Sequence, residues 1–269
     1  MFVLYLAQRM RVYGLSHQLI RMLALVDVTL GLGVVLMVAV GQYLGHDAAF
    51  KSEVFCPLFG FIANYFSGLS ALLIGLLSFE RYCLICHHFS LKTQIGWYVV
   101  VVFGAVFLVG AAGSSATNSF SPDPTFSYCW PSGTGWATVA NSCLTLTFIA
   151  SLVVLTFCYI AIFVSCYRWN RPSNRMQLTI KAEAARVSRR AALQAIFFIV
   201  MYHLCFLPKF ISTMWQMLGN PQTHPFVLYM LGPVGISLST AINPLMVIFL
   251  HSSFREEAAV VLGMDNDQD

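Results

Sequence analysis

The chain has 269 residues, of which 58% are hydrophobic and only 10% carry a charge. Soluble domains carry about 25% charged residues, so this composition excludes an ordinary water-soluble globular domain. The net charge of +4 does not indicate nucleic-acid binding, because the basic residues lie in short loops between apolar stretches and not on one folded basic surface.

Long apolar stretches follow one another along the chain, each about 20 residues or longer. A helix of that length crosses a hydrocarbon core of about 30 Å at about 1.5 Å per residue, so we expect an all-α membrane protein. The opening segment MFVLYLAQR is apolar but too short to cross, and it lacks the features of a signal peptide. We interpret it as the end of a first helix whose beginning is missing. The predicted spans cover 22–44, 54–79, 95–116, 137–167, 193–218 and 226–250.

Lysine and arginine residues define the orientation of these spans. If the end of the 54–79 span faces the cytoplasm, all of the 15 basic residues except Lys51 and Lys209 lie on the cytoplasmic side. This is the asymmetry that the positive-inside rule describes, and we assign the protein to the plasma membrane as a multi-pass integral protein. Residues 1–250 are expected to form the membrane domain, and residues 251–269 an amphipathic interfacial helix and a short tail.

The cysteines divide between the two sides of the membrane. Cys56 and Cys129 fall on the outer side, where disulfides persist, and the outer loop at 117–135 is expected to be irregular because it is rich in Ser, Pro and Gly. The motif CLICH at 83–87 has the spacing of a haem-attachment site. It lies on the cytoplasmic side, however, and its residues are too close together to surround a metal ion while helical, so chance spacing is the simpler interpretation.

Polar side chains at membrane depth are costly and mark candidate functional positions. Asp27 lies in an apolar span and needs a partner, a proton or a cation, while Ser70, Ser239 and Asn243 lie in other spans. These four residues could form one polar cluster around water or Na⁺. The alternative is that each makes an unrelated local hydrogen bond.

The span at 193–218 contains Pro208, which removes a backbone hydrogen bond and is expected to kink the helix. A kink suits a helix that swings during a switch, and static packing is the alternative. Lys209 follows the proline. Its amine either extends outward to the membrane surface or faces the bundle and pairs with an anionic ligand.

Several short motifs occur in one order and at specific spacings. Cys56 lies 25 residues before Arg81, which is the centre of Glu80-Arg81-Tyr82. The other positions of the set are Leu23, Ala24 and Asp27, then Cys129, Tyr159, Cys205, Pro208, Asn243, Pro244 and Phe254. With these residues the chain resembles the rhodopsin-like (class A) G-protein-coupled receptors over almost its whole length.

The resemblance implies a seven-transmembrane helix bundle in which an extracellular ligand leads to activation of a heterotrimeric G protein at the cytoplasmic face. Arg81 would be the switch residue, held by Glu80 at rest and released toward Tyr159 on activation. The coupling residues implied in this way are Glu80, Arg81, Tyr82, Tyr159, Asn243 and Pro244.

The same resemblance assigns a sodium site to Asp27, Ser70 and Asn243, with Ser239 one turn away. It also implies a disulfide that tethers the outer loop over the ligand pocket, formed by Cys56 and Cys129. Apart from Na⁺, no metal or cofactor is expected.

The chain departs from the family pattern at several positions. Phe206 replaces a tryptophan, Val247 replaces the tyrosine that follows Asn-Pro, and Ser151 replaces the proline of the fifth helix. Ser188 stands where an acidic residue is usual at the base of the sixth helix. The absence of that acidic residue argues against a standard ionic lock at the cytoplasmic end.

Two positions argue against familiar ligands. Ala63 stands where amine receptors carry an aspartate, so an amine ligand is not expected. Ser237 stands where opsins carry the retinal lysine, so a retinal Schiff base is not expected unless Lys209 takes the place of that lysine. An opsin-like receptor without that lysine is an alternative, and a multi-span transporter is another, although no inverted repeat is evident. The extracellular ligand is expected to contact Asn64, Ser67, Phe206, Lys209, Phe210, Thr213 and Ser237.

Overall fold

The computed structural model contains long helices and one short strand pair. Its helices are α2 (Leu15–Leu44), α4 (Phe55–His87), α5 (Thr93–Ala116) and α6 (Trp136–Trp169), and its strands are β1 (Phe120–Pro122) and β2 (Cys129–Pro131). The residues that the structure describes are 5, 14–45, 52–122, 129–131 and 135–169, followed by helical residues at 196–197, 199–208, 210–212, 214–215, 227, 231, 234–235 and 237–243. The predicted interfacial helix at 251–269 and most of 1–9 lie outside this part of the chain.

All four long helices are long and apolar enough to cross a membrane, and a shorter apolar helix runs from Ile199 to Ser212. Large apolar side chains point away from the bundle, including Val35 on α2, Val101 on α5 and Leu146 on α6, each of which is more than 60% exposed. Such side chains are favourable in contact with lipid and would be costly in water. The all-α membrane architecture predicted from composition is therefore confirmed.

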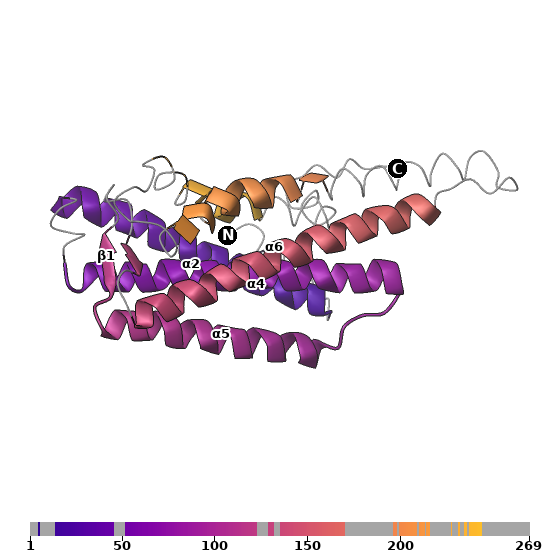
Figure 1. The fold of residues 1–269 in the computed structure, drawn as a ribbon, viewed down its shortest axis with the longest axis horizontal. Coiled ribbons are helices and arrows are strands. Elements are labelled where there is room, and N and C mark those ends of the chain that lie inside the picture. The colour runs from indigo at the N-terminus through magenta and orange to yellow at the C-terminus, as the bar shows by residue number, and fades with distance from the viewer. Residues whose placement is uncertain are drawn as a thin grey trace, which may run out of the picture.

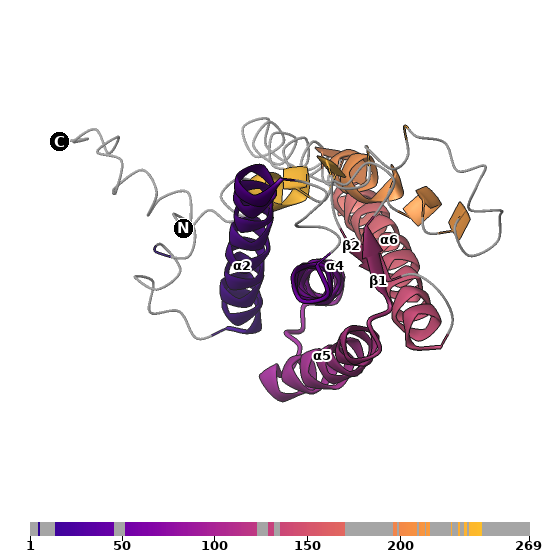
Figure 2. The ribbon, with the colours of Figure 1, turned by 90° about the vertical axis from the view of Figure 1, so that its left-hand side faces the viewer.

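Helix α4 is the centre of the bundle. It contacts α2, α5 and α6, and the view along the helices shows α4 between these three neighbours (Figure 2). All four helices run roughly along the long axis of the molecule (Figure 1). In both views the described residues near 200 lie beside α6, and those near 240 lie beside α2 (Figures 1 and 2).

The helix ends differ from the predicted spans on the side that the sequence assigns to the cytoplasm. Helix α2 begins seven residues before the predicted start at 22, because Leu15, Leu19 and Ile20 are buried in the core although Arg21 interrupts the apolar run. Helix α4 continues to His87, well beyond the predicted end at 79. Hydropathy marks the lipid-embedded part of a helix, whereas the helix itself continues into the interfacial region.

The outer loop is more regular than predicted. Instead of an irregular segment, β1 and β2 pair antiparallel with Phe120 opposite Pro131. Phe120 is buried, and its ring covers Gly60 on α4, where an added Cβ would come within 2.2 Å of the ring. The glycine therefore lets the hairpin lie directly on the outer end of α4. Strands this short give little alternation in the sequence, so composition could not reveal them.

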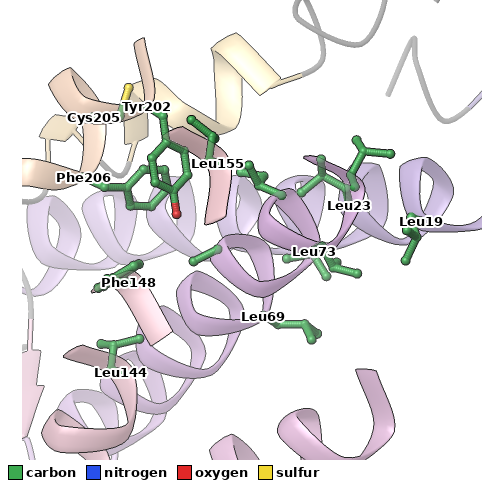
Figure 3. Packing of buried hydrophobic residues seen from close by; sticks show 14 of the residues in the cluster. Leu19, Leu23, Leu69, Leu73, Leu144, Phe148, Leu155, Tyr202, Cys205 and Phe206 are labelled. Carbon is green, nitrogen blue, oxygen red and sulfur yellow. The ribbon is translucent and has the colours of Figure 1, made fainter. Parts of the chain in front are cut away.

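The hydrophobic core runs through the middle of the bundle. Figure 3 shows side chains from α2, α4 and α6 meeting those of the 199–208 helix. Leu73 of α4 and Phe148 of α6 are almost completely buried, and Phe206 packs against Phe148 with tilted rings whose centroids are 5.4 Å apart. The labelled residues of this core are Leu19, Leu23, Leu69, Leu73, Leu144, Phe148, Leu155, Tyr202, Cys205 and Phe206.

Candidate functional site

A buried polar cluster joins α2, α4 and the helical segment at 237–243. Ser70 Oγ lies 3.1 Å from Asp27 Oδ1. Asn243 Nδ2 lies 3.3 and 3.1 Å from the two carboxylate oxygens of Asp27 and 3.5 Å from Ser70 Oγ. All three side chains are buried: Asp27 is 3% exposed, Ser70 is 1% exposed and Asn243 is 6% exposed. Residues from three separate parts of the sequence therefore converge on one carboxyl group.

The electrostatics of this cluster are governed by Asp27. A carboxylate removed from water needs a compensating charge, a proton or several hydrogen-bond donors. Ser70 and Asn243 supply neutral donors, which satisfy lone pairs without neutralising the charge. Carboxylate and hydroxyl oxygens are also the ligands that hard cations prefer, so the donor set is chemically suited to Na⁺. Ser239 is buried one turn before Asn243 on the same segment.

At the cytoplasmic end, Glu80 is buried and accepts a hydrogen bond from the Ser16 hydroxyl of α2. The bond links the start of α2 to the end of α4. The resemblance instead assigned Glu80 to hold Arg81, and that role remains a prediction. Ser16 was missed in the sequence because the predicted span began at 22, after this serine.

A cavity of about 410 Å³ lies next to this bond. Its polar lining comes from both helices and from the segment that leads into α5. The lining residues include Ser16, His17, Glu80, Arg81, Ser90 and Thr93. The predicted switch residue therefore lies at a hollow that contains acidic, basic and hydroxyl groups.

Tyr82 and Tyr159 lie on the α6 side of the same helix end. Tyr82 Oη lies 2.9 Å from His87 Nε2, and its ring packs edge-on against Phe157 of α6 with centroids 5.6 Å apart. Tyr159 is buried, and its hydroxyl faces Ser78 of α4 close to Arg81. The structure thus brings Glu80, Arg81 and both tyrosines to one end of the bundle, while Pro244 lies outside the described residues.

At the outer end, Cys56 and Cys129 form a disulfide with their Cα atoms 5.4 Å apart. This confirms the pairing that the resemblance implied. The bond attaches β2 to the first turn of α4, and both cysteines are buried.

The predicted ligand-contacting residues do not gather in one described cavity. Asn64 and Ser67 are buried on α4, but their side chains hydrogen-bond to backbone carbonyls one turn earlier, Nδ2 of Asn64 to Gly60 at 2.8 Å and Ser67 to Ala63. Asn64 Oδ1 has no hydrogen-bond partner among the described residues.

The remaining predicted contacts are distributed elsewhere. Phe206 is part of the aromatic core, and Phe210 lines a groove of about 480 Å³ between its helix and α6. Ser237 is half-buried. Lys209 and Thr213 lie outside the described residues, so the composition of the ligand pocket stays a prediction.

The sequence model of the 7 transmembrane receptor (rhodopsin family) matches residues 1–246 of the chain. The chain belongs to this family. It is accordingly a multi-pass integral membrane protein, and the family is that of the G-protein-coupled receptors. The fold agrees: squid rhodopsin superposes with a TM-score of 0.72 at 18% identity, over 98% of this chain and 80% of that one.

Similar curated proteins include opsins and amine-type receptors. The chain is 23% identical to the visual pigment-like receptor peropsin of Mus musculus over 216 residues, 75% of this chain. It is 22% identical to the blue-sensitive opsin of Oryzias latipes over 227 residues, 80% of this chain. It is 24% identical to trace amine-associated receptor 5 of Homo sapiens over 266 residues, 92% of this chain and 75% of that protein. The chain spans only 61% and 62% of the length of the first two relatives.

Proposed function

We propose that this receptor binds an extracellular ligand at the plasma membrane and activates a heterotrimeric G protein by rearranging its helices. The observation that carries the proposal is the Asp27 cluster, in which one carboxyl group is shared by three helical segments. A movement of any one segment alters the hydrogen bonds of the other two, which is what a switch between two arrangements requires.

Arg81 provides the test of this function. The receptor would be reconstituted in lipid nanodiscs, and guanine-nucleotide exchange measured on representatives of each class of G protein. Exchange would be measured first without ligand and then during a screen of candidate ligands. In at least one of these conditions it should exceed the exchange of the G protein alone. Arg81→Ala should abolish this exchange, because the cation at the cytoplasmic cavity is lost.

The unfolding temperature of Arg81→Ala serves as the control and should stay within a few degrees of the parent protein. Exchange that persists in a folded Arg81→Ala receptor would contradict the proposed role of the arginine. Exchange that never exceeds that of the G protein alone, under any of the conditions, would contradict the proposed function.

We further propose that Na⁺ binds at Asp27. A ligand that binds only the folded state stabilises it by about 1.4 kcal/mol at ten times its Kd. The unfolding temperature should therefore rise when choline chloride is replaced by NaCl at constant ionic strength. Asp27→Asn keeps the side-chain shape and removes the charge, so the dependence on Na⁺ should disappear. An equal rise in both proteins would exclude this site.

Light detection is a second candidate, because two of the relatives are named as opsin-type proteins. Ser237 cannot form a Schiff base, and the α4 segment around Ala63 carries no carboxylate for an amine ligand. Purified protein incubated with 11-cis and all-trans retinal is expected to show no visible absorption band. A band that survives washing would favour the photoreceptor alternative.

A further inference from the structure

A cavity of about 670 Å³ lies between α4, α5 and α6, three helices that contact one another on one side of the bundle (Figure 2). Its lining includes Phe103, Val106 and Leu146, whose side chains are exposed on the apolar surface of the bundle. Gly75 and Phe107 also line it and are buried. The cavity therefore opens toward the hydrocarbon of the bilayer.

The cavity has about the length of one membrane leaflet. Along α6 its lining extends from Cys143 to Val154, and eleven residues at about 1.5 Å each make about 16 Å, against a hydrocarbon core of about 30 Å. The lining side chains are hydrocarbon except for Cys143, Thr147 and Ser151, and the Thr147 hydroxyl donates to the Cys143 carbonyl at 2.9 Å. The space therefore suits a single apolar body about as long as half the membrane.

A narrow crevice adjoins this cavity and ends at Asn64 of α4. It shares Val106, Phe107 and Cys143 with the larger cavity, and its own volume is about 10 Å³. A volume of about 10–15 Å³ is what one water molecule needs. A single hydroxyl group therefore fits in the crevice, whereas a phosphate or another charged headgroup does not.

Asn64 presents an unused acceptor to this crevice. Its Nδ2 lies 2.8 Å from the Gly60 carbonyl, and because a carbonyl can only accept, this contact fixes the orientation of the amide. Asn64 is 6% exposed, and its Oδ1 has no hydrogen-bond partner in the part of the chain that the structure describes. A buried acceptor without a donor is costly at membrane depth, so the crevice ends at a group that needs a hydroxyl.

We propose that the cavity between α4, α5 and α6 binds a membrane sterol, whose hydroxyl enters the crevice and donates to Asn64 Oδ1. A sterol combines one hydroxyl donor with an apolar body, and its fused rings lose little conformational freedom on binding. The flat rings also suit the aromatic side chains of Phe79, Phe103 and Phe107 in the lining. The sterol reaches Asn64 from the bilayer, so this site is separate from an extracellular ligand pocket and does not depend on the proposed signalling function.

The test measures sterol binding to the whole chain in phosphatidylcholine nanodiscs. A cholesterol probe with a diazirine on its side chain is photolysed, and mass spectrometry locates the labelled peptides. Cholesterol and cholest-5-ene, which has the same body without the hydroxyl, then compete with the probe. Labelling should fall on α4, α5 and α6, and cholesterol should compete about fivefold better than cholest-5-ene, the ratio that one hydrogen bond is worth.

Three variants separate the hydroxyl contact from the cavity. Asn64→Leu keeps the approximate shape of the side chain and removes the acceptor, so the preference for cholesterol over cholest-5-ene should disappear. Ala150→Phe places a ring in the cavity from an exposed position and should abolish labelling. Val153→Phe adds the same ring at an exposed position of α6 outside this cavity and should leave labelling unchanged.

Equal competition by the two compounds in the parent protein, or a preference that survives in Asn64→Leu, would overturn the assignment of the hydroxyl to Asn64. Labelling that persists in Ala150→Phe, or competition by a long-chain alcohol as strong as that by cholesterol, would overturn the sterol site. If Asn64→Leu does not fold, the comparison of the two compounds on the parent protein and the two phenylalanine variants still decides the proposal. No G protein enters these measurements, so a failure of the proposed function leaves their outcome unaffected.

Discussion

Ser70 and Ser67 lie about one turn apart on α4 and are equally buried, yet their hydroxyls have different partners. Ser70 donates to the carboxyl group of Asp27 on α2, whereas Ser67 donates to the Ala63 carbonyl of its own helix. The same contrast separates Asn243, which bonds across helices, from Asn64, which bonds to Gly60. Burial of a polar residue therefore does not by itself distinguish a cluster shared between helices from a local hydrogen bond; the partner of the side chain does.

The largest effect is expected at Asn243. Asn243→Ala removes the amide that donates to both oxygens of Asp27 and leaves the buried carboxyl group short of donors. Hydrogen bonds to charged groups contribute about 1.5–3 kcal/mol, so the free energy of unfolding should fall by about 2 kcal/mol. Thermal unfolding in a defined detergent measures this loss. Asn64→Ala is the comparison, and an equal loss there would remove the distinction between the two asparagines.

A smaller effect is expected at Ser70. Ser70→Ala deletes one interhelical hydrogen bond, and such bonds in membrane proteins contribute about 0.6 kcal/mol on average, with a maximum of about 1.7. We expect a loss of about 1 kcal/mol, because the acceptor is a carboxyl group. Urea or guanidinium titration of the purified receptor would resolve a difference of this size from the parent protein.

The smallest effect is expected at Ser67. Ser67→Ala removes a hydroxyl bonded to the carbonyl one turn earlier, and such bonds compete with the helix and slightly destabilise it. The stability should change by less than about 0.5 kcal/mol in either direction. The two serine substitutions delete the same atom from the same helix, so a Ser67→Ala loss as large as that of Ser70→Ala would show that burial alone sets the cost.

The same distinction explains how much the sequence could predict. The apolar stretches correctly predicted the membrane fold, because hydropathy depends only on composition. The orientation inferred from the basic loops stays a prediction. The sequence also placed Asp27, Ser70 and Asn243 on a short list, but it left a shared cluster and separate local bonds as alternatives. Which of the two alternatives holds depends on how each helix is turned about its own axis. Packing against α4 decides that orientation.

Contacts between distant polar residues were the least predictable part. Ser16 lay outside the predicted span, and nothing in its neighbourhood indicated that Glu80 would be its partner. The disulfide was implied in advance only by the family resemblance, in which Cys56 and Cys129 match the outer-side cysteine pair.

The attachment of the outer hairpin to α4 has a mechanical consequence. Cys129 is bonded to the first turn of α4, and Phe120 rests on Gly60 of the same helix. From Cys56 to Arg81 the chain is continuous helix, and 25 residues at about 1.5 Å each make a rod of about 37 Å. A push or twist delivered to the hairpin outside the membrane is therefore carried to the arginine on the opposite side by a single rigid lever.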